Sequence, residues 1–257
     1  MIQLNHKSFG QGDAIVILHG LFGTLDNWQT LAKKLAEDYY VFLVDQRNHG
    51  RSPHVEGMSY PLMANDLKEF LEQNWIHQAH IIGHSMGGKT AMQFALDYPD
   101  LVNKLVVVDI APKTYLGGHE LILSALRNFP VNSVESRKEA EQTLLEAGIE
   151  ELGIRQFLLK NLTRSKAGGY EWKMNFPEID KHYQNILANI EAENKSPFDG
   201  KTLFIRGANS NYIQDADADL IETLFPQSTL ETVPQAGHWV HAEQPQALLE
   251  LLRNFLD

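Results

Sequence analysis

Residues 83–90, Gly-His-Ser-Met-Gly-Gly-Lys-Thr, decide the fold of this chain. An apolar run that ends at Ile82 leads into them, and apolar residues at helical spacing follow them. The predicted order is therefore a strand, a sharp turn and a helix. Gly83, Ser85 and Gly87 form the pattern G-x-S-x-G, which is typical of a nucleophile elbow.

The spacing of this pattern has a physical reason. A serine in a strained turn needs small residues two positions before and two positions after it, so that the backbone can fold tightly. Its hydroxyl group then projects above the sheet at the N-terminus of the following helix. Backbone N–H groups and the helix dipole stabilise a developing negative charge there. Ser85 is therefore a candidate nucleophile.

The same stretch also matches G-x-x-x-x-G-K-[ST], the phosphate-binding loop of NTPases, through Gly83, Gly88, Lys89 and Thr90. Residues 105–109, Leu-Val-Val-Val-Asp, resemble the magnesium-binding strand of such proteins. A third interpretation is an ordinary tight turn without function. The local sequence does not separate the three interpretations, so the rest of the chain has to decide between them.

Composition limits the kind of protein. A length of 257 residues suits one α/β domain, or one domain that carries an insertion. The net charge of −11 argues against nucleic acid or an anionic membrane as a partner. The absence of cysteine excludes disulfides, thiol catalysis and cysteine metal sites. The start of the chain is polar, and no apolar run approaches the roughly 18 residues of a membrane span, so we expect a cytoplasmic protein.

Short apolar runs alternate with helical patterns over most of the chain. This alternation predicts an α/β fold with a mostly parallel twisted sheet and helices on both faces. Residues 2–8 are a candidate edge strand, and the expected buried strands lie at 14–18, 41–44, 80–82, 104–109, 202–205 and 230–233. Ligands of such sheets bind beyond the carboxyl ends of the strands. Four polar residues follow strands at these ends: His19, Asp45, Ser85 and Asp109.

Residues 113–198 interrupt the alternation, because they contain helical patterns and no apolar buried strand. The helical patterns lie at 120–129, 134–147, 150–162 and 180–193, and residues 168–174 could hold a short strand. We therefore expect a core domain of residues 1–112 and 199–257, with a helical lid or cap over 113–198 that covers the site. The alternative is a surface layer without function.

Four segments together resemble the α/β-hydrolase superfamily. His19-Gly20 resembles its oxyanion loop, residues 45–52 its D-x-R-G-x-G-x-S loop with Asn48 in place of a glycine, and Gly237-His238 its catalytic histidine loop. With the elbow, the combination is most similar to the YbfF-type bacterial esterases. The resemblance implies an α/β-hydrolase fold with a helical lid. It also favours the elbow over the phosphate loop. A phosphate loop normally follows the first strand of its domain, and the NTPase interpretation leaves the other three segments unexplained.

The resemblance implies roles for particular residues. Ser85 is the expected nucleophile and His238 the expected base, since it alone follows the last predicted strand behind a glycine. The family usually places its acid after strand 202–205, but the loop there has no carboxylate before Asp215. Asp109 stands at the alternative family position, so we expect it to orient the histidine. Ser210 occupies roughly the usual acid position and is an expected hydrogen-bond partner of the acid or of the histidine.

Further residues are expected around this set. The oxyanion hole should use the backbone N–H of Met86 and that of Leu21, with Phe22 as the alternative to Leu21. Phe22 and Trp239 are expected to bind substrate. His84 should point away from Ser85 across the turn, and His19 and His49 should be hydrogen-bonded loop residues. An apolar acyl pocket is expected from Leu116, Phe157, Leu158, Trp172 and Trp239, which could equally be plain core.

The expected activity is that of a serine esterase. It would hydrolyse carboxylic esters or thioesters with a small to medium acyl group through an acyl-enzyme, without a cofactor or a metal. Alternatives on the same fold are a carbon–carbon bond hydrolase and a cofactor-free peroxidase. Alternatives of another class are a non-catalytic binding module and a P-loop NTPase. The expected partner is a small-molecule ester rather than nucleic acid or a membrane, and the expected state is a monomer or a small homo-oligomer.

Overall fold

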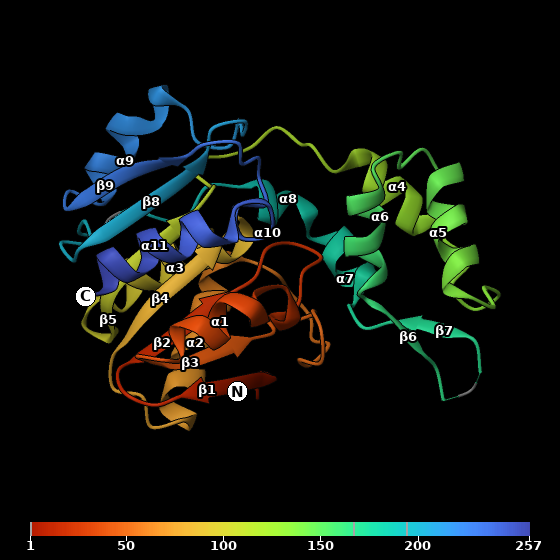
Figure 1. Cartoon of the computed structure of the whole chain (residues 1–257), viewed down its shortest axis with the longest axis horizontal. Helices are drawn as coiled ribbons and strands as arrows, with labels where there is room; N and C mark the ends of the chain where they lie inside the picture. Colours follow the sequence, from red (N-terminus) through yellow and green to blue (C-terminus); the bar gives the residue numbers. More distant parts are fainter. Residues whose placement is uncertain (1, 167, 194) are drawn as a thin grey trace.

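The computed structural model describes residues 2–166, 168–193 and 195–257. Its main sheet has seven strands in the order β1-β3-β2-β4-β5-β8-β9 (Figure 1). The edge strand β1 (His6–Gly10) runs antiparallel to β3 (Tyr40–Val44), and the other neighbouring strands are parallel. The parallel strands are β2 (Ala14–Leu18), β4 (Ala79–His84), β5 (Val102–Val108), β8 (Thr202–Gly207) and β9 (Ser228–Val233). The predicted mostly parallel α/β sheet is confirmed.

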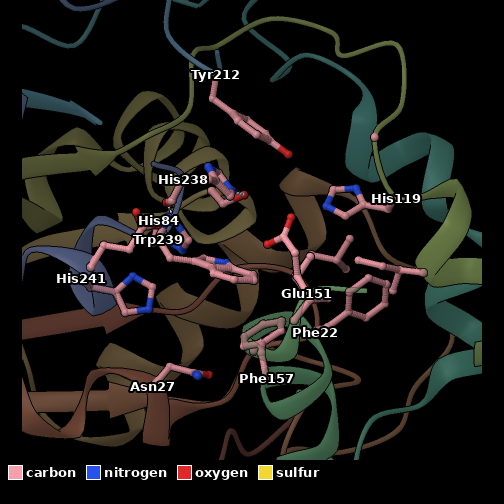
Figure 2. Close-up of a pocket in the computed structure, with 18 of the residues that line it drawn as sticks. Phe22, Asn27, His84, His119, Glu151, Phe157, Tyr212, His238, Trp239 and His241 are labelled. Atoms are coloured by element: carbon pink, nitrogen blue, oxygen red, sulfur yellow. Dashed lines mark hydrogen bonds between the residues drawn. The ribbon is translucent and has the colours of Figure 1, made fainter. Parts of the chain in front are cut away.

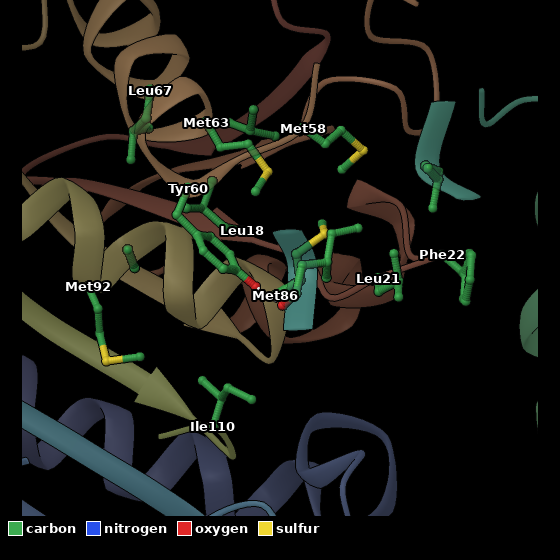
Figure 3. Packing of buried hydrophobic residues seen from close by; sticks show 14 of the residues in the cluster. Leu18, Leu21, Phe22, Met58, Tyr60, Met63, Leu67, Met86, Met92 and Ile110 are labelled. Carbon is green, nitrogen blue, oxygen red and sulfur yellow. Dashed lines mark hydrogen bonds between the residues drawn. The ribbon is translucent and has the colours of Figure 1, made fainter. Parts of the chain in front are cut away.

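Helices cover both faces of this sheet. Along β2, Val16 and Leu18 point into one core, and Ile15 and Ile17 point into the other, because successive strand residues face opposite sides. The first core contains α2 (Tyr60–Gln73), α3 (Met86–Asp97) and α9 (Ala218–Leu224), and the second contains α1 (Gln29–Leu35) and α11 (Pro245–Leu256). Figure 3 shows residues of α2 and α3 packed together in the first core. Short helical turns are η1 (Leu25–Trp28), η2 (Pro99–Leu101), η3 (Asp215–Asp217) and α10 (Val240–Glu243).

The turn between β4 and α3 has the predicted tight geometry. Ser85 has φ 53° and ψ −118°, a backbone conformation that costs free energy for any residue with a side chain. A Cβ atom on Gly83 would collide with the Gly87 carbonyl, and one on Gly87 would collide with the carbonyl of Leu18. Glycine is therefore required on both sides of Ser85, and the strained turn lifts its hydroxyl above the end of the sheet.

The insertion contains five helices and one hairpin in the described ranges. These elements are α4 (Glu120–Arg127), α5 (Arg137–Glu146), α6 (Leu152–Leu159), α7 (Phe176–Lys181), α8 (Tyr183–Leu187), β6 (Leu162–Arg164) and β7 (Tyr170–Trp172). Figure 1 shows α4 to α7 and the hairpin to one side of the sheet. The predicted helical pattern over 180–193 is right as far as residue 187, where α8 ends, and wrong beyond it, because the chain turns extended at Ala188. The division into a core and a lid stays a prediction.

Lys89 links this insertion to the helix that follows Ser85. Its side chain is 1% exposed, and its ammonium group donates to the carbonyls of Lys113 (2.6 Å), Leu187 (3.2 Å) and Ala188 (2.5 Å). Lys113 lies where the chain enters the insertion, and Leu187 ends α8. Three N–H donors therefore meet three carbonyl acceptors, and both arms of the insertion are tied to α3. No helix in the described ranges is long and apolar enough to cross a membrane.

We expect Lys89→Met to lower the free energy of unfolding by about 3 kcal/mol, because it leaves buried carbonyl groups without a donor. Urea unfolding followed by circular dichroism measures the change. Lys68→Met is the matched control, since Lys68 lies partly exposed on α2, where it pairs with Glu72 and lies 5.9 Å from the centre of the Tyr98 ring. Its cost should stay below about 0.5 kcal/mol. Equal stability of Lys89→Met and the wild type would contradict this role.

Candidate active site

Three strand ends bring Ser85, Asp109 and His238 together. Ser85 follows β4, Asp109 follows β5, and His238 follows β9 after a short loop. His238 Nε2 lies 3.0 Å from Ser85 Oγ, and His238 Nδ1 lies 2.7 Å from Asp109 Oδ2. A carboxylate only accepts hydrogen bonds, so Nδ1 carries the proton of the neutral ring. Nε2 is therefore free to accept the hydroxyl proton of Ser85.

The Asp109 carboxylate is fully buried and held on both oxygens. Oδ1 accepts the backbone N–H of Gly207 at 3.0 Å, and Oδ2 accepts a short hydrogen bond from the Ser210 hydroxyl as well as the bond from His238. The Ser210 oxygen in turn accepts the N–H of Tyr212 at 3.2 Å. Three partners thus fix the carboxylate, and the loop after β8 supplies a hydroxyl where the family usually supplies the acid.

The strand-end loops concentrate backbone strain. Six residues other than glycine have positive φ in the described ranges, and five of them lie in these loops: Phe22 (58°), Asn48 (62°), Ser85 (53°), Asp109 (52°) and Gln235 (58°). Such conformations persist only where surrounding contacts enforce them, and they are common at functional sites. The contacts here are the hydrogen bonds of the loops that surround Ser85.

Two backbone N–H groups next to Ser85 have no acceptor in the described part of the chain. Met86 is the first residue of α3, so its N–H has no partner within the helix. The Leu21 N–H also lacks an acceptor, whereas the Phe22 N–H donates to His49 Nε2 at 3.2 Å. The pattern therefore favours Leu21 over Phe22 as the second oxyanion donor.

Histidines hold the loop that contains Leu21. His19 Nε2 accepts the Gln46 N–H at 3.1 Å, and His49 Nδ1 donates to the Arg47 carbonyl at 3.0 Å. Asn161, in the insertion, donates to the Phe22 carbonyl at 2.6 Å. His19 and His49 are thus the hydrogen-bonded loop residues that the sequence indicated, and their contacts hold the loop in which Leu21 lines the same cavities as Ser85.

Comparison with known proteins agrees with this geometry. The sequence profile of a family described as alpha/beta hydrolase fold matches residues 13–245. The chain belongs to the alpha/beta hydrolase family. It is 38% identical to esterase YbfF of Escherichia coli K12 over 95% of this chain and 92% of that protein. It is also 40% identical to the mouse sn-1-specific diacylglycerol lipase ABHD11, over 95% of this chain and 80% of the relative.

A solved structure extends the similarity to the whole fold. A structure described as a marine microorganism esterase has a TM-score of 0.96 and 42% identity, covering 99% of this chain and all of that one. The predicted similarity to YbfF-type esterases is confirmed. The chain is an α/β-hydrolase of the carboxylic ester hydrolase type, as its relatives are named.

This α/β-hydrolase departs from its family pattern at Asn48, and the structure supplies a reason. Asparagine tolerates the positive φ found there better than most residues with a side chain. The Asn48 side-chain oxygen accepts the N–H of Val55 at 2.9 Å and the side-chain amide of Asn175 at 3.1 Å. Its backbone carbonyl accepts the Asn175 N–H at 2.8 Å. Asparagine thus keeps the turn and connects it to the insertion.

The NTPase alternative is wrong, because its key side chains are used inside the fold. The Lys89 ammonium group donates to three carbonyls. The Thr90 hydroxyl donates to Gln46 Oε1 at 2.8 Å and also lies 3.1 Å from the Met86 carbonyl oxygen. Both residues are about 1% exposed. Neither can reach a phosphate or a magnesium ion. In the described ranges, no group of three or more acidic, histidine or cysteine residues is arranged to hold a metal ion.

Tyr212 is a site residue that the sequence analysis missed. Its ring stacks on the His238 imidazole with centroids 3.7 Å apart and an interplanar angle of 16°. Burial raises the pKa of its phenol, so the hydroxyl keeps its proton at neutral pH. Its position two residues after Ser210 was a signal for proximity, but no local pattern indicates stacking. The contact fixes the plane of the histidine.

A cavity of about 300 Å³ opens beside Ser85 and His238 (Figure 2). Phe22, Phe157 and Trp239 line it, as predicted for pocket residues. The prediction is wrong for the other three pocket candidates. Leu116 is fully exposed on the chain that enters the insertion, Leu158 is buried in the core, and Trp172 packs on Phe129 with ring centroids 4.9 Å apart.

Buried histidines surround the cavity without contacting the Ser85 hydroxyl. His84 Nε2 donates to the His238 carbonyl at 2.8 Å, so its ring is bonded to the backbone and not to the Ser85 hydroxyl, as predicted. Burial holds the pKa of His84 well below its ordinary value. Burial also lowers the pKa of His49 to about 3, that of His241 to about 3 and that of His119 to about 4. These rings are therefore neutral at pH 7.

We expect the free energy of unfolding to fall as the pH drops from 7 to 5. The unfolded chain protonates each histidine near pH 6.5, whereas the folded chain holds His49 and His241 neutral down to about pH 3. The contribution of these histidines to the free energy of unfolding is therefore fully present above pH 6.5 and is lost below it. For a ring as buried as His49, the loss is about 2 kcal/mol at pH 5. Urea unfolding at several pH values measures the slope.

His241→Gln tests the origin of this slope. His241 stacks on Trp28, and its Nδ1 atom is buried without a hydrogen-bond partner, although part of the residue is exposed. The variant should show a shallower fall in stability between pH 6.5 and pH 5, and His77→Gln, an exposed control, should keep the wild-type slope. Identical slopes for His241→Gln and the wild type would contradict the assignment.

Proposed function

We propose that Ser85, His238 and Asp109 form the catalytic triad of a serine esterase that works through an acyl-enzyme. The observation that carries this proposal is the unbroken hydrogen-bond chain from Ser85 Oγ through the His238 ring to the buried Asp109 carboxylate. The N–H groups of Leu21 and Met86 have no acceptor in the described ranges, and both residues line a cavity together with Ser85. A nucleophile, a base, an orienting acid and an oxyanion site are the parts that acyl transfer requires.

In the first half-reaction, Ser85 Oγ attacks the ester carbonyl carbon while His238 Nε2 takes the hydroxyl proton. The N–H groups of Leu21 and Met86 stabilise the negative charge that develops on the carbonyl oxygen. The bond between the carbonyl carbon and the alcohol oxygen then breaks, and His238 returns its proton to that oxygen. The products are a free alcohol and an acyl group bound to Ser85.

In the second half-reaction, water attacks the acyl-enzyme and gives its proton to His238 Nε2. The bond to Ser85 Oγ breaks, and His238 protonates that oxygen, which releases the carboxylic acid and restores the starting state. Asp109 stabilises the protonated imidazole in both steps, and Ser210 supports Asp109 through its hydroxyl. No step needs a cofactor.

We assign the substrate class as uncharged esters with a small to medium acyl group. The large cavity presents aromatic rings and two carboxylates, those of Glu151 and Glu243. The Glu243 carboxylate accepts the backbone N–H groups of Gly237 and Trp239, whereas Glu151 has no hydrogen-bond or ion-pair partner in the described ranges. Figure 2 shows Glu151 directed into the cavity. The names of the ABHD11 relatives make glycerides a second candidate class. Carbon–carbon hydrolysis and peroxidation use similar triads, and substrate profiling separates them from ester hydrolysis.

Labelling with a fluorophosphonate tests the proposed function. Intact mass should show one adduct on the wild type and none on Ser85→Ala, because only an activated serine reacts. Folded wild-type protein that forms no adduct, and that hydrolyses no ester, would overturn the proposal.

Glu151→Gln should raise kcat/KM for an anionic ester relative to a neutral one by about three- to tenfold at low salt, because it removes repulsion inside the cavity. Acetoxybenzoate and phenyl acetate form a suitable pair, and their intrinsic reactivities cancel when the variant is divided by the wild type. Glu150→Gln, an exposed neighbour that does not line the cavity, should leave the ratio unchanged. Equal ratios for both variants would show that Glu151 does not act on the substrate.

A further inference from the structure

Two cavities meet at Ser85. The large one, of about 300 Å³, is lined by His238, Trp239 and Phe157. The second has about 30 Å³ and lies under Tyr60, Ile110, Ile186 and Leu187. The residues that line both cavities are Leu21, Ser85, His119 and Tyr212. A substrate attached to Ser85 therefore has two spaces of very different size, one for each side of its carbonyl group.

The position of His238 decides which half of an ester enters which cavity. The alcohol oxygen must lie within hydrogen-bond reach of His238 Nε2, since that atom supplies its proton. His238 lines the large cavity and does not line the small one. Met86, which carries an oxyanion N–H, lines the small cavity instead. The alcohol part therefore extends into the large cavity, and the acyl substituent points into the small one.

The small cavity is apolar although polar residues surround it. The Tyr60 hydroxyl donates to the Ile186 carbonyl at 2.5 Å, and the Tyr115 hydroxyl donates to the Tyr212 carbonyl at 2.7 Å. The Lys89 ammonium has all three donors bound to carbonyls. No donor of these groups remains for a ligand, and the other polar side chains here, those of Ser85, His119 and Tyr212, also line the large cavity. A polar or charged substituent beside Tyr60, Tyr115 and Lys89 would therefore lose its hydration without gaining a partner. Figure 3 shows Tyr60, Met86 and Ile110 around this region.

The volume sets an upper size for the acyl group. A space of 30 Å³ holds about two water-sized groups. A methyl or an ethyl substituent fills it, whereas a longer chain requires the packed side chains of Ile110, Ile186 or Leu187 to move. Ile110 is also confined, because it packs against Gly88 of α3 closely enough that a Cβ atom there would collide with it. The cavity can therefore widen mainly on the side of the insertion.

We infer that this enzyme is selective for acetyl and propionyl esters of larger, mostly apolar alcohols, with Ile186 and Leu187 of the insertion limiting the acyl length. The inference rests on the proposed esterase function of Ser85. It makes long-chain diacylglycerols poor substrates, because their long chains lie on the acyl side of the ester.

Two substrate series test the inference on the wild-type enzyme. In p-nitrophenyl esters of increasing acyl length, kcat/KM should fall by about tenfold or more from propionate to butyrate and again to hexanoate, since one methylene in a tight pocket is worth about 10- to 200-fold. In acetates of increasing alcohol size, from methyl to 2-naphthyl, kcat/KM should not fall. A preference for hexanoate over acetate would overturn the inference.

A matched pair of variants assigns the cavities. Ile186→Ala enlarges the small cavity, and Ile154→Ala makes the same change in the large one. Ile186→Ala should raise the butyrate-to-acetate ratio of kcat/KM by about tenfold or more, and Ile154→Ala should leave it within about twofold. Ile186→Val removes one methyl group with little cost to folding and should give an intermediate ratio.

The outcomes separate the two levels of the proposal. Hydrolysis of all esters at the background rate, without a fluorophosphonate adduct, would defeat the proposed function itself. If the enzyme hydrolyses esters and only Ile154→Ala changes the acyl-length ratio, while both Ile186 variants keep it, the proposed esterase function stands. The assignment of the two cavities would then be reversed. A changed ratio in Ile186→Ala and Ile186→Val alone supports the inference.

Discussion

Ser85→Ala is expected to lower kcat for ester hydrolysis by about 10⁴- to 10⁶-fold, and His238→Ala by a similar factor. In the proposed mechanism the two side chains act as one unit, because the proton that activates Ser85 passes along the 3.0 Å hydrogen bond between them. The double variant should therefore be no slower than either single variant. The residual rate comes from the oxyanion hole and from substrate binding.

Steady-state kinetics with p-nitrophenyl acetate measures these losses. Thermal unfolding of each variant is the control, because removing the Ser85 hydroxyl from its strained turn should not unfold the protein. A folded Ser85→Ala that retains more than about a tenth of wild-type kcat would contradict the assignment of the nucleophile. Losses that multiply in the double variant would contradict the shared proton transfer.

Asp109→Asn is expected to lower kcat by about 10⁴-fold while leaving the fold intact. The amide keeps the size of the side chain but cannot hold His238 Nδ1–H and stabilise a positive imidazole as the carboxylate does. Ser210→Ala should cost far less, about tenfold, since it removes one of three hydrogen bonds to the carboxylate.

Asp215→Asn is the matched control for this assignment. Asp215 is the first carboxylate after β8, in the region where the family usually places its acid, but its side chain is mostly exposed and pairs with Arg206 at 2.7 Å. Its variant should keep wild-type kcat. A large loss in Asp215→Asn, or a loss below about tenfold in Asp109→Asn, would show that Asp109 is not the orienting acid.

Several features of the site could be predicted from single segments. The G-x-S-x-G pattern indicated the strained turn, because glycine is the residue that fits where a Cβ atom would collide with a neighbouring backbone. Because residues 207–212 contain no carboxylate, Asp109 was the predicted orienting acid. The Ser85, Asp109 and His238 side chains do meet, although their catalytic roles stay predictions until the variants are measured.

Other features needed contacts between distant segments. Local patterns do not connect Tyr212 with His238, Lys89 with the three carbonyls around it, or the Phe22 N–H with the His49 ring that accepts it. The prediction that Leu116 lines an acyl pocket was wrong. The sequence of a connecting segment does not indicate whether an apolar side chain faces the core or the solvent, and Leu116 is exposed. The exposed or buried state of such residues depends on how the insertion packs on the core.

The sequence by itself determined the alternation of strands and helices, the elbow and the strand-end positions of the reacting residues, because spacing and residue size act over a few neighbours. Only the tertiary structure decided the size of the two cavities and the hydrogen-bond partners of Lys89, Thr90 and the Asp109 carboxylate. Those properties depend on side chains about a hundred residues apart in sequence, such as Asp109 and Ser210. Such residues meet only when the strands assemble in their order in the sheet and the insertion packs against it.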